Sequence, residues 1–345
     1  ASHNENGWTG VKMGIKKGLT HTPEEMNELK EITLNNKFIE GNGNEKKIEN
    51  FQKIYIQDLV QKNKINKKIT AVVACGNGTA GIFAPEILRG IGCKVVELDC
   101  NLDFTFPKYN PNPEDLKMLH ALSNAVKKNK ADIGFAFDGD GDRLIIVDEK
   151  GHTIDGDRIL ALLSKELINN NTLNKKTVVS TVMSNLGFEN YLKNILDVKL
   201  IRTAVGDINV IEEMQKNSFS LGGEQSGHII FGKYSKTGDG ILTSLKILEI
   251  LKKSKIKTSE LFNIYDSYPQ EKINIPLNGK LKNELIDKIQ NLSADCRKKK
   301  PHLRYVIRES GTESLLRILV EGKNEEEVKK EINNLSNNIK AIINV

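Results

Sequence analysis

The sequence predicts an α/β fold, because short apolar segments alternate with segments of helical periodicity from residue 69 to residue 252. Alternation of this kind is typical of helices packed on mostly parallel sheets. Around residues 263–269 the pattern changes to strand, helix, strand, strand, helix. We therefore expect a domain boundary near Tyr268 and a smaller α+β unit after it.

The first α/β cycle is expected to end in a hairpin. In chain order its elements are strand 69–75, helix 81–90, strand 94–98, helix 114–128, strand 132–137 and strand 144–148. The second of these helices has apolar residues at helical spacing, at Leu116, Leu119, Leu122 and Val126. The last two strands are close enough in sequence to pair, with residues 149–151 as a turn.

A similar cycle then restarts. Its expected elements are helix 159–168, strand 177–181, helix 187–196, strand 199–203, helix 206–216 and helix 239–252. The α+β unit is expected to contain strand 272–275, helix 280–292, strands 304–308 and 315–321, and a closing helix from residue 325.

Composition places the chain among globular proteins. Its 345 residues are 38% hydrophobic and 28% charged, which allows two to four domains with real cores. No apolar run approaches the roughly 18 residues of a membrane helix, so we expect no membrane partner. The net charge of +6 is spread over the chain, as on a solvated surface that can also steer an anionic ligand; we expect no nucleic-acid partner. Four cysteines without CxxC spacing indicate a reduced, cytoplasmic protein: Cys75, Cys93, Cys100 and Cys296.

The segment 138–143, DGDGDR, lies between two predicted strands and predicts a metal site. Interleaved glycines allow positive φ angles, so that the carboxylates can curl around one centre. Such hard oxygen ligands suit Mg²⁺ or Ca²⁺. A calcium EF-hand loop is an alternative, since Glu149 falls at its twelfth position, but Arg143 stands at the sixth, where that loop needs glycine. A solvated acidic turn is the remaining alternative. The ligands would be Asp138, Asp140 and Asp142.

The segment 76–81, GNGTAG, matches the glycine pattern of dinucleotide-binding turns between a strand and a helix. Glu97 and Asp99 lie about 20 residues further on, where such a fold carries an acidic group for the ribose. A cofactor site for a dinucleotide oxidoreductase is therefore one interpretation. A structural turn is the other, because any tight strand-to-helix turn favours glycine.

Two further loops carry groups suited to sugars or phosphates. Loop 222–228, GGEQSGH, offers an acceptor, a hydroxyl and an imidazole to sugar hydroxyls, at Glu224, Ser226 and His228. Loop 308–313, RESGTE, with Arg317 after it, offers a guanidinium fork, hydroxyls and amides that could cradle a phosphate. Ordinary polar loops are the alternative for both.

Taken together and in this order, these segments resemble the α-D-phosphohexomutase family of phosphoglucomutases, phosphomannomutases and phosphoglucosamine mutases. The resemblance covers essentially the whole chain. It also extends to the opening segment, where Ser2 and His3 match a T-A-S-H-N loop whose serine is phosphorylated in the family. Lys12 follows shortly after. From the residues alone, a serine beside a histidine indicates almost nothing.

The resemblance implies a role for each motif. Mg²⁺ would be held by Ser2, Asp138, Asp140 and Asp142. The catalytic groups would be Ser2, His3, Lys12 and Arg143. Among them, Lys12 is the expected acid/base-type group. Sugar hydroxyls would be bound by Glu224 and Ser226, with His228 beside them, and the substrate phosphate by Arg308, Ser310, Gly311, Thr312 and Arg317.

The implied reaction is an isomerisation that moves a phosphoryl group between the 1- and 6-positions of a hexose phosphate. It would pass through a phosphoserine and a hexose bisphosphate. Gln225 and residues 236–240 look closest to phosphoglucosamine mutases, whereas residues 6–12 look more like bacterial phosphomannomutase/phosphoglucomutase sequences, so the sugar stays open. An inactive fragment that binds sugar phosphate is a further alternative.

The resemblance also implies a domain plan: three related α/β domains, the first of them truncated, and a smaller C-terminal α+β domain around a central cleft. The expected domains are 1–52, 53–155, 156–266 and 267–345, with one motif in each. The serine loop stands at residue 2, so we expect the N-terminal part of the first domain to be missing. Residues 1–50 would then be poorly anchored, with exposed apolar side chains around Ile32, Leu34 and Phe38.

Overall fold

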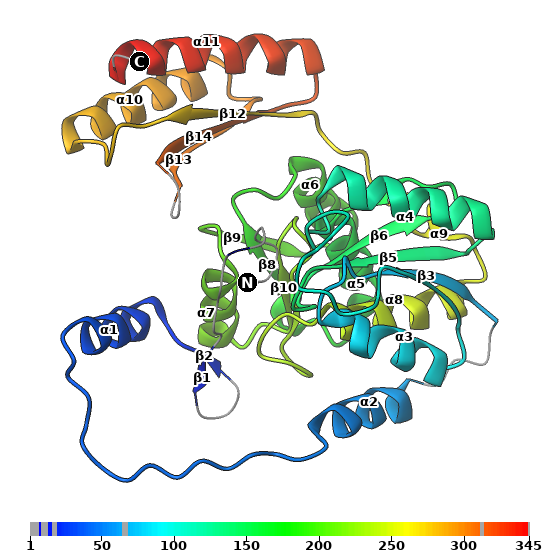
Figure 1. Ribbon diagram of the computed structural model, residues 1–345. Coiled ribbons are helices and arrows are strands. Elements are labelled where there is room, and N and C mark those ends of the chain that lie inside the picture. The colour runs from blue at the N-terminus through cyan, green and yellow to red at the C-terminus, as the bar shows by residue number, and fades with distance from the viewer. Residues whose placement is uncertain (1–6, 8–12, 16–18, 64–67, 311–313, 344–345) are drawn as a thin grey trace. The chain divides into compact units, whose positions relative to one another are not determined.

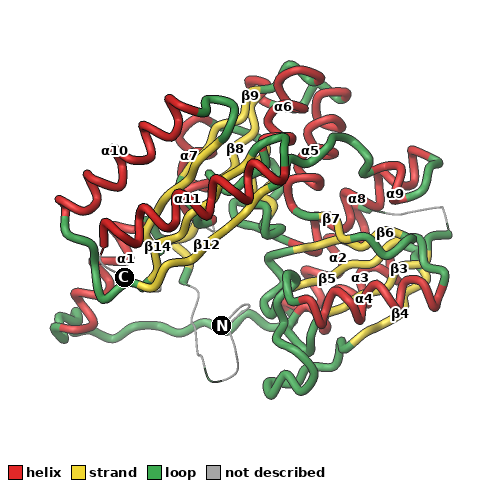
Figure 2. Tube along the Cα trace, turned by 90° about the horizontal axis from the view of Figure 1, so that it is seen from above, coloured by secondary structure: helices red, strands yellow, loops and turns green. Residues whose placement is uncertain are grey.

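The computed structural model describes residues 1–345 except 1–6, 8–12, 16–18, 64–67, 311–313 and 344–345. The chain divides into two compact units, drawn in Figures 1 and 2. The first comprises Ala1–Thr181 and Leu192–Ile264, and the second comprises Val182–Tyr191 and Tyr265–Val345. None of the helices in the described part is long and apolar enough to cross a membrane.

The first unit contains a five-stranded sheet in the order β4-β3-β5-β6-β7. Its strands are β3 (Thr70–Ala74), β4 (Lys94–Leu98), β5 (Ile133–Phe137), β6 (Leu144–Asp148) and β7 (Thr153–Ile154). The strands β4, β3 and β5 are parallel, whereas β6 and β7 are antiparallel to their neighbours. Helix α4 (Leu116–Asn129) covers one face, and α3 (Ala80–Gly90) and α8 (Gly240–Ser254) cover the other (Figure 1).

Burial on both faces explains why the central strands read as continuous apolar runs. Every residue of β5 and β6 is buried. Helix α4 packs closely on β5, because a Cβ at Gly134 would lie 2.7 Å from the Val126 side chain and 2.8 Å from that of Leu122. The glycine therefore lets α4 approach β5, the strand that precedes the aspartate segment 138–143.

A second sheet in the first unit repeats this topology, in the order β11-β10-β8-β9. Its elements in chain order are α5 (Gly156–Asn169), a 3₁₀ turn (Asn174–Lys176), β8 (Thr177–Thr181), α6 (Leu186–Ile195), β9 (Lys199–Thr203), α7 (Asp207–Asn217), β10 (Leu221–Gly223) and β11 (Ile229–Phe231). Helix α6 belongs to this unit only from Leu192 onward. The strands β9, β8 and β10 are parallel, and β11 is antiparallel to β10. The loop between β10 and β11 therefore corresponds to the loop between β5 and β6.

The N-terminal part of the first unit holds the short hairpin β1 (Gly14–Ile15) and β2 (Leu19–Thr20), and the helices α1 (Pro23–Leu34) and α2 (Phe51–Lys62). Helix α2 packs against α3, where a Cβ at Gly90 would lie 2.7 Å from the Val60 side chain. At the end of α1, Leu34 is 67% exposed and Ile32 is half-buried, and in the segment after it Phe38 is 61% exposed. Apolar side chains are thus exposed where the sequence indicated them.

The second unit is a three-stranded antiparallel sheet in the order β12-β14-β13. Its elements are β12 (Gln270–Pro276), α10 (Asn283–Lys299), β13 (Arg304–Glu309), β14 (Leu315–Glu321) and α11 (Glu325–Ile343). Both helices lie on one face of the sheet (Figures 1 and 2). Between them and the sheet is a core that includes Ile275, Tyr305, Ile318, Val320 and Leu335.

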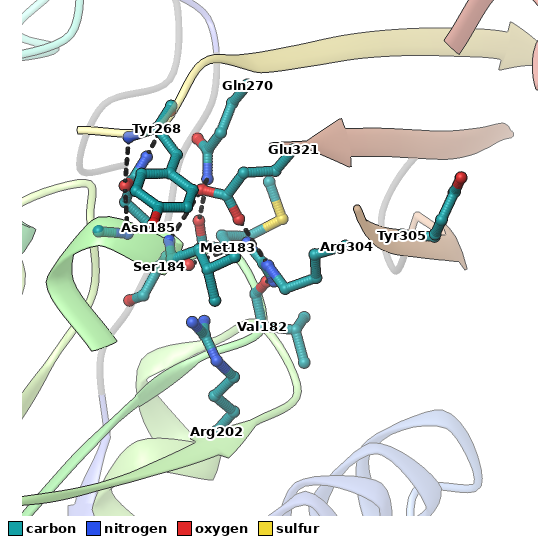
Figure 3. A network of polar contacts seen from close by, with 12 residues as sticks. Val182, Met183, Ser184, Asn185, Arg202, Tyr268, Gln270, Arg304, Tyr305 and Glu321 are labelled. Carbon is teal, nitrogen blue, oxygen red and sulfur yellow. Dashed lines mark hydrogen bonds and ion pairs between the residues drawn. The ribbon is translucent and has the colours of Figure 1, made fainter. Parts of the chain in front are cut away.

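Residues 182–191 belong to the second unit although they follow β8 in sequence, and Figure 3 shows the contacts that hold them. The Arg304 guanidinium donates to the carbonyls of Val182, at 2.7 Å, and Ser184, at 2.9 Å. Its Nε lies 2.6 Å from the buried carboxylate of Glu321, which also accepts from the Leu186 amide at 2.8 Å. One buried ion pair therefore binds this segment to the C-terminal sheet.

The α/β fold with a smaller C-terminal α+β unit is confirmed. The expected helices and strands from residue 69 onward are present, and the largest difference is helix α10, expected at 280–292 and found at Asn283–Lys299. The sequence analysis missed β10 and β11, which are three residues long each, and also β7 and the four-residue helix α9 (Thr258–Leu261). The division into four domains stays a prediction.

Candidate active site

The three aspartates of the loop between β5 and β6 lie together. Asp138 is buried, Asp142 is half-buried and Asp140 is exposed, and one carboxylate oxygen from each lies within 4.8 Å of the others. Gly141 has a φ of 79°, which lets the chain curl at this point. Asp138 accepts from the Arg143 amide at 3.0 Å, and Nε of Arg143 lies 4.0 Å from the second oxygen of Asp138.

This donor set fits a hard divalent cation. Three carboxylates this close repel one another unless a cation lies between them, and oxygen-only ligands are those that Mg²⁺ and Ca²⁺ prefer. The EF-hand alternative does not fit, because the loop is flanked by strands and Glu149 is engaged elsewhere. Its carboxylate accepts from the Ser259 amide at 2.9 Å and from the Ser259 hydroxyl at 2.6 Å.

The glycine turn after β3 supports the aspartate loop. The Thr79 amide donates to the Gly139 carbonyl at 2.7 Å, and a Cβ at Gly78 would lie 2.7 Å from the Gly139 Cα. The Asn77 and Gly78 amides donate to carbonyls of Asp99 and Cys75. Amides that a pyrophosphate would need are therefore occupied, which favours the structural interpretation of this turn.

The acidic groups that a dinucleotide ribose would need are also engaged. Glu97 forms an ion pair with Arg89. Asp99 pairs with Lys108 and accepts from the Tyr109 hydroxyl at 2.5 Å. Burial, followed by the Asp99 carboxylate, raises the pKa of Tyr109 well above its usual range.

The second polar loop connects β10 to β11. It is closed by two backbone hydrogen bonds between Glu224 and its loop neighbours, one from the Gly227 amide at 3.0 Å and one to the His228 carbonyl at 2.9 Å. Glu224 is 7% exposed and accepts from the Gly206 amide at 3.1 Å, which fixes its carboxylate. Ser226 is half-buried. The loop thus presents a held carboxylate and a hydroxyl.

The two loops form one structure. The Leu144 amide donates to the Gly227 carbonyl at 3.0 Å, and Arg143 forms an isolated antiparallel bridge with His228. The start of α8 also contacts the aspartate loop, since the Gly240 amide donates to the Gly141 carbonyl at 2.9 Å. Gly227 has a φ of 94°, and a Cβ there would lie 2.3 Å from the Leu144 carbonyl oxygen. The aspartate loop (residues 138–143) and the loop between β10 and β11 (residues 222–228), which we call the sugar-type loop, are therefore joined through their backbones. The contacts at Gly227 leave no room for a side chain.

His228 lies at this junction and is 2% exposed. Its Nδ1 lies 3.5 Å from Asp142, and its Nε2 accepts from the Gly238 amide at 3.1 Å. Burial lowers the pKa of His228, but the carboxylates of Asp142, Asp207 and Glu224 outweigh it and raise the pKa above the ordinary value.

Sequence reasoning missed the residues that frame this junction from residue 238 onward. Asp239 caps helix α8 through the Leu242 amide, at 2.8 Å, and accepts from the Tyr55 hydroxyl at 3.0 Å. Burial raises the pKa of Asp239. The signal was present as the glycine-flanked segment 236–240, but only the fold places it beside the aspartate loop.

The third polar loop belongs to the second unit, between β13 and β14. Arg308 and Arg317 stand directly opposite each other on these strands. Like charges in such a pair repel, which favours an anionic ligand beside them. The Ser310 amide donates to the Leu315 carbonyl at 2.8 Å and closes the hairpin. Gly311 and Thr312 lie outside the described residues.

The N-terminal site residues also lie outside the described residues: Ser2, His3 and Lys12. The structure therefore brings together the aspartates with Arg143 and His228 in the first unit, and Arg308 with Arg317 in the second.

Comparison with known proteins shows the family to which the chain belongs. The phosphoglucomutase/phosphomannomutase models of α/β/α domain II, α/β/α domain III and the C-terminal domain match residues 53–151, 155–268 and 273–336. A phosphoglucosamine mutase of Sulfurovum is 39% identical, over 94% of this chain and 74% of its own length. The chain belongs to the α-D-phosphohexomutase family. Another phosphoglucosamine mutase, from Caldicellulosiruptor saccharolyticus, is 37% identical to this phosphohexomutase chain over 99% of the chain and 78% of its own length.

Solved structures agree with the fold of this family member. A phosphoglucomutase/phosphomannomutase family protein from Burkholderia thailandensis has a TM-score of 0.86 at 24% identity, over 99% of this chain and 75% of its own. An N-acetylphosphoglucosamine mutase from Aspergillus fumigatus, in complex with GlcNAc-6P and magnesium, has a TM-score of 0.61 at 18% identity, over 84% of this chain and 64% of its own. The named relatives support a mutase, that is, an isomerase function.

Proposed function

We propose that this phosphohexomutase is Mg²⁺-dependent and moves a phosphoryl group between the 1- and 6-positions of an amino-hexose phosphate. The observation that carries the proposal is the cluster of three carboxylates within 4.8 Å, joined by backbone hydrogen bonds to the sugar-type loop. Glucosamine phosphate is the proposed substrate, because the relatives at 37–39% identity are named phosphoglucosamine mutases.

The proposed metal ligands are Asp138, Asp140 and Asp142, together with phosphorylated Ser2. A bound Mg²⁺ supplies positive charge that neutralises the transferring phosphoryl group. Arg143 lies beside Asp138 and is proposed to add a second positive charge there. These residues account for charge neutralisation, which together with positioning is the main requirement of phosphoryl transfer.

In the first transfer, the bond between phosphorus and Oγ of Ser2 breaks and a bond to one sugar hydroxyl forms. The hydroxyl proton is taken up by the amine of Lys12, with His3 as its neighbour in the serine loop. In the second transfer, the other phosphate of the hexose bisphosphate returns to Ser2, and the proton passes back to the oxygen that it leaves. Serine is rephosphorylated, so no phosphate is consumed.

The remaining residues are proposed to bind the sugar phosphate. Glu224 accepts from sugar hydroxyls and Ser226 donates or accepts, with His228 beside them. The phosphate is held by the arginine pair and the hairpin between β13 and β14, that is, by Arg308, Ser310, Gly311, Thr312 and Arg317. Because either end of the substrate carries the phosphate in turn, this loop must accept both. We further propose a cytoplasmic location, supported by the four free thiols.

A coupled assay tests the proposal. Glucosamine, mannose and glucose phosphates are each supplied with a trace of the hexose bisphosphate, with Mg²⁺ or with a chelator. We expect turnover to be fastest with glucosamine phosphate and to disappear with the chelator. Sugar-phosphate binding without turnover of any sugar would instead favour the inactive fragment. Binding of NAD(P) to the chain would favour the oxidoreductase.

A further inference from the structure

The buried ring of His228 has a fixed polarity. The Gly238 amide donates to Nε2 at 3.1 Å, nearer than the Asp207 carboxylate at 3.8 Å, so this nitrogen is an acceptor. In a neutral imidazole the proton is then on the other nitrogen. That nitrogen, Nδ1, faces Asp142 at 3.5 Å. The backbone of residue 238 thereby determines which ring nitrogen offers a proton to the aspartate loop.

The surrounding backbone leaves the ring little freedom. A Cβ at Gly238 would lie 2.4 Å from Nε2, so the amide approaches the ring only because this residue is glycine. On the other side, His228 forms an isolated antiparallel bridge with Arg143, the residue after Asp142. The ring and the carboxylate are therefore held in register by the same short contact between the two loops.

We propose that His228 is a positioning residue, which orients the Asp142 carboxylate through its Nδ1–H tautomer and so raises the metal affinity of the aspartate loop. The inference rests on the proposed function, since it requires the aspartates to bind a divalent cation. It gives His228 a role through Asp142 in addition to its place beside the sugar. Outer hydrogen-bond partners of metal ligands commonly change metal affinity by roughly 10–100-fold.

Two substitutions separate the two ring nitrogens. In His228→Asn the side-chain amide stands near the position of Nδ1 and keeps a donor toward Asp142. In His228→Gln the terminal group stands near the position of Nε2, and the donor toward Asp142 is lost. Mn²⁺ affinity, measured by calorimetry, should fall by roughly 10–100-fold in His228→Gln. His228→Asn should keep most of the affinity. Both variants remove the buried ring, so the difference between them reports the donor toward Asp142.

The matched control is Ser226→Ala, on the same loop, which should weaken sugar-phosphate binding and leave Mn²⁺ affinity unchanged. If His228→Gln binds Mn²⁺ as tightly as the parent chain, the inference is wrong while the metal site stands. If the parent chain does not bind Mn²⁺, the metal site and the inference both fail.

A second measurement uses the unaltered chain and does not depend on any variant folding. Nitrogen-15 NMR of the histidine rings distinguishes the two neutral tautomers. For His228 we expect the proton on Nδ1. Mg²⁺ is used here because it is diamagnetic, and the Nδ1 resonance should shift between the metal-free chain and the chain saturated with Mg²⁺. A proton on Nε2 would overturn the proposal.

Discussion

Asp140→Asn should separate the charge repulsion within the aspartate loop from its metal binding. One carboxylate oxygen of Asp140 lies within 4.8 Å of one from each of two other aspartates, and two unit charges at that distance repel by about 1 kcal/mol in a water-like dielectric. The Asp140 side chain is exposed, so the water-like dielectric is the appropriate one. Removing the charge should therefore raise the free energy of unfolding by about 1–2 kcal/mol in the absence of divalent cations.

In the presence of Mg²⁺ the parent chain should be more stable than Asp140→Asn. A ligand at 100 times its dissociation constant stabilises the folded state by about 2.7 kcal/mol, and the parent chain should show such a gain, whereas Asp140→Asn should show none. Urea unfolding with Mg²⁺ and with a chelator measures both effects. Asp58→Asn is the control, because Asp58 is an exposed aspartate of α2 that forms an ion pair with Lys62. A variant that is less stable without Mg²⁺ and keeps the full Mg²⁺ response would refute the reasoning.

Three further predictions concern other parts of the account. Arg308→Lys keeps the charge and loses the planar fork, so calorimetry should show sugar-phosphate binding weakened by about 1–3 kcal/mol, and unchanged affinity would remove this residue from the site. Gly227→Ala places a Cβ 2.3 Å from the Leu144 carbonyl at a φ of 94°, and should cost about 3 kcal/mol of unfolding free energy as well as Mg²⁺ affinity. Ser259→Ala should cost about 1 kcal/mol at pH 7. Burial raises the pKa of Glu149, but the Ser259 hydrogen bonds lower it by more, so that the pKa lies below its ordinary value. This stabilisation is therefore present above the ordinary pKa and is lost as the pH falls through the lowered pKa. A cost in urea unfolding that persists undiminished at pH 3 would contradict this.

The sequence predicts the regular elements well because most of them are buried on one or both faces. Strand β5 and helix α4 are examples, since their apolar residues face each other across a close contact at Gly134. Strands β10 and β11 carry no such signal, because each is three residues long and the first ends in two glycines. They form because β10 pairs with β8 and β11 pairs with β10.

The candidate site was predictable where its chemistry is written in adjacent residues. The alternating aspartates indicate a metal site by themselves, and the aspartate oxygens indeed lie within 4.8 Å of one another. Contacts over long sequence separations were not predictable. No local pattern indicates that the Gly240 amide meets the Gly141 carbonyl, or that Arg304 holds Val182. The glycine turn at 76–81 shows the reverse case, since its pattern suggests a ligand and its amides bind neighbouring carbonyls.

The central claim is that the aspartate loop supports a Mg²⁺-dependent exchange of phosphoryl positions on an amino-hexose. Phosphorus-31 NMR tests it most directly, by following glucosamine 6-phosphate with a trace of the bisphosphate, Mg²⁺ and either the parent chain or Asp140→Asn. The account predicts that the 1-phosphate resonance grows with the parent chain and does not grow with the variant. Equal growth with both chains, or growth with the parent chain in the presence of a chelator, would contradict it.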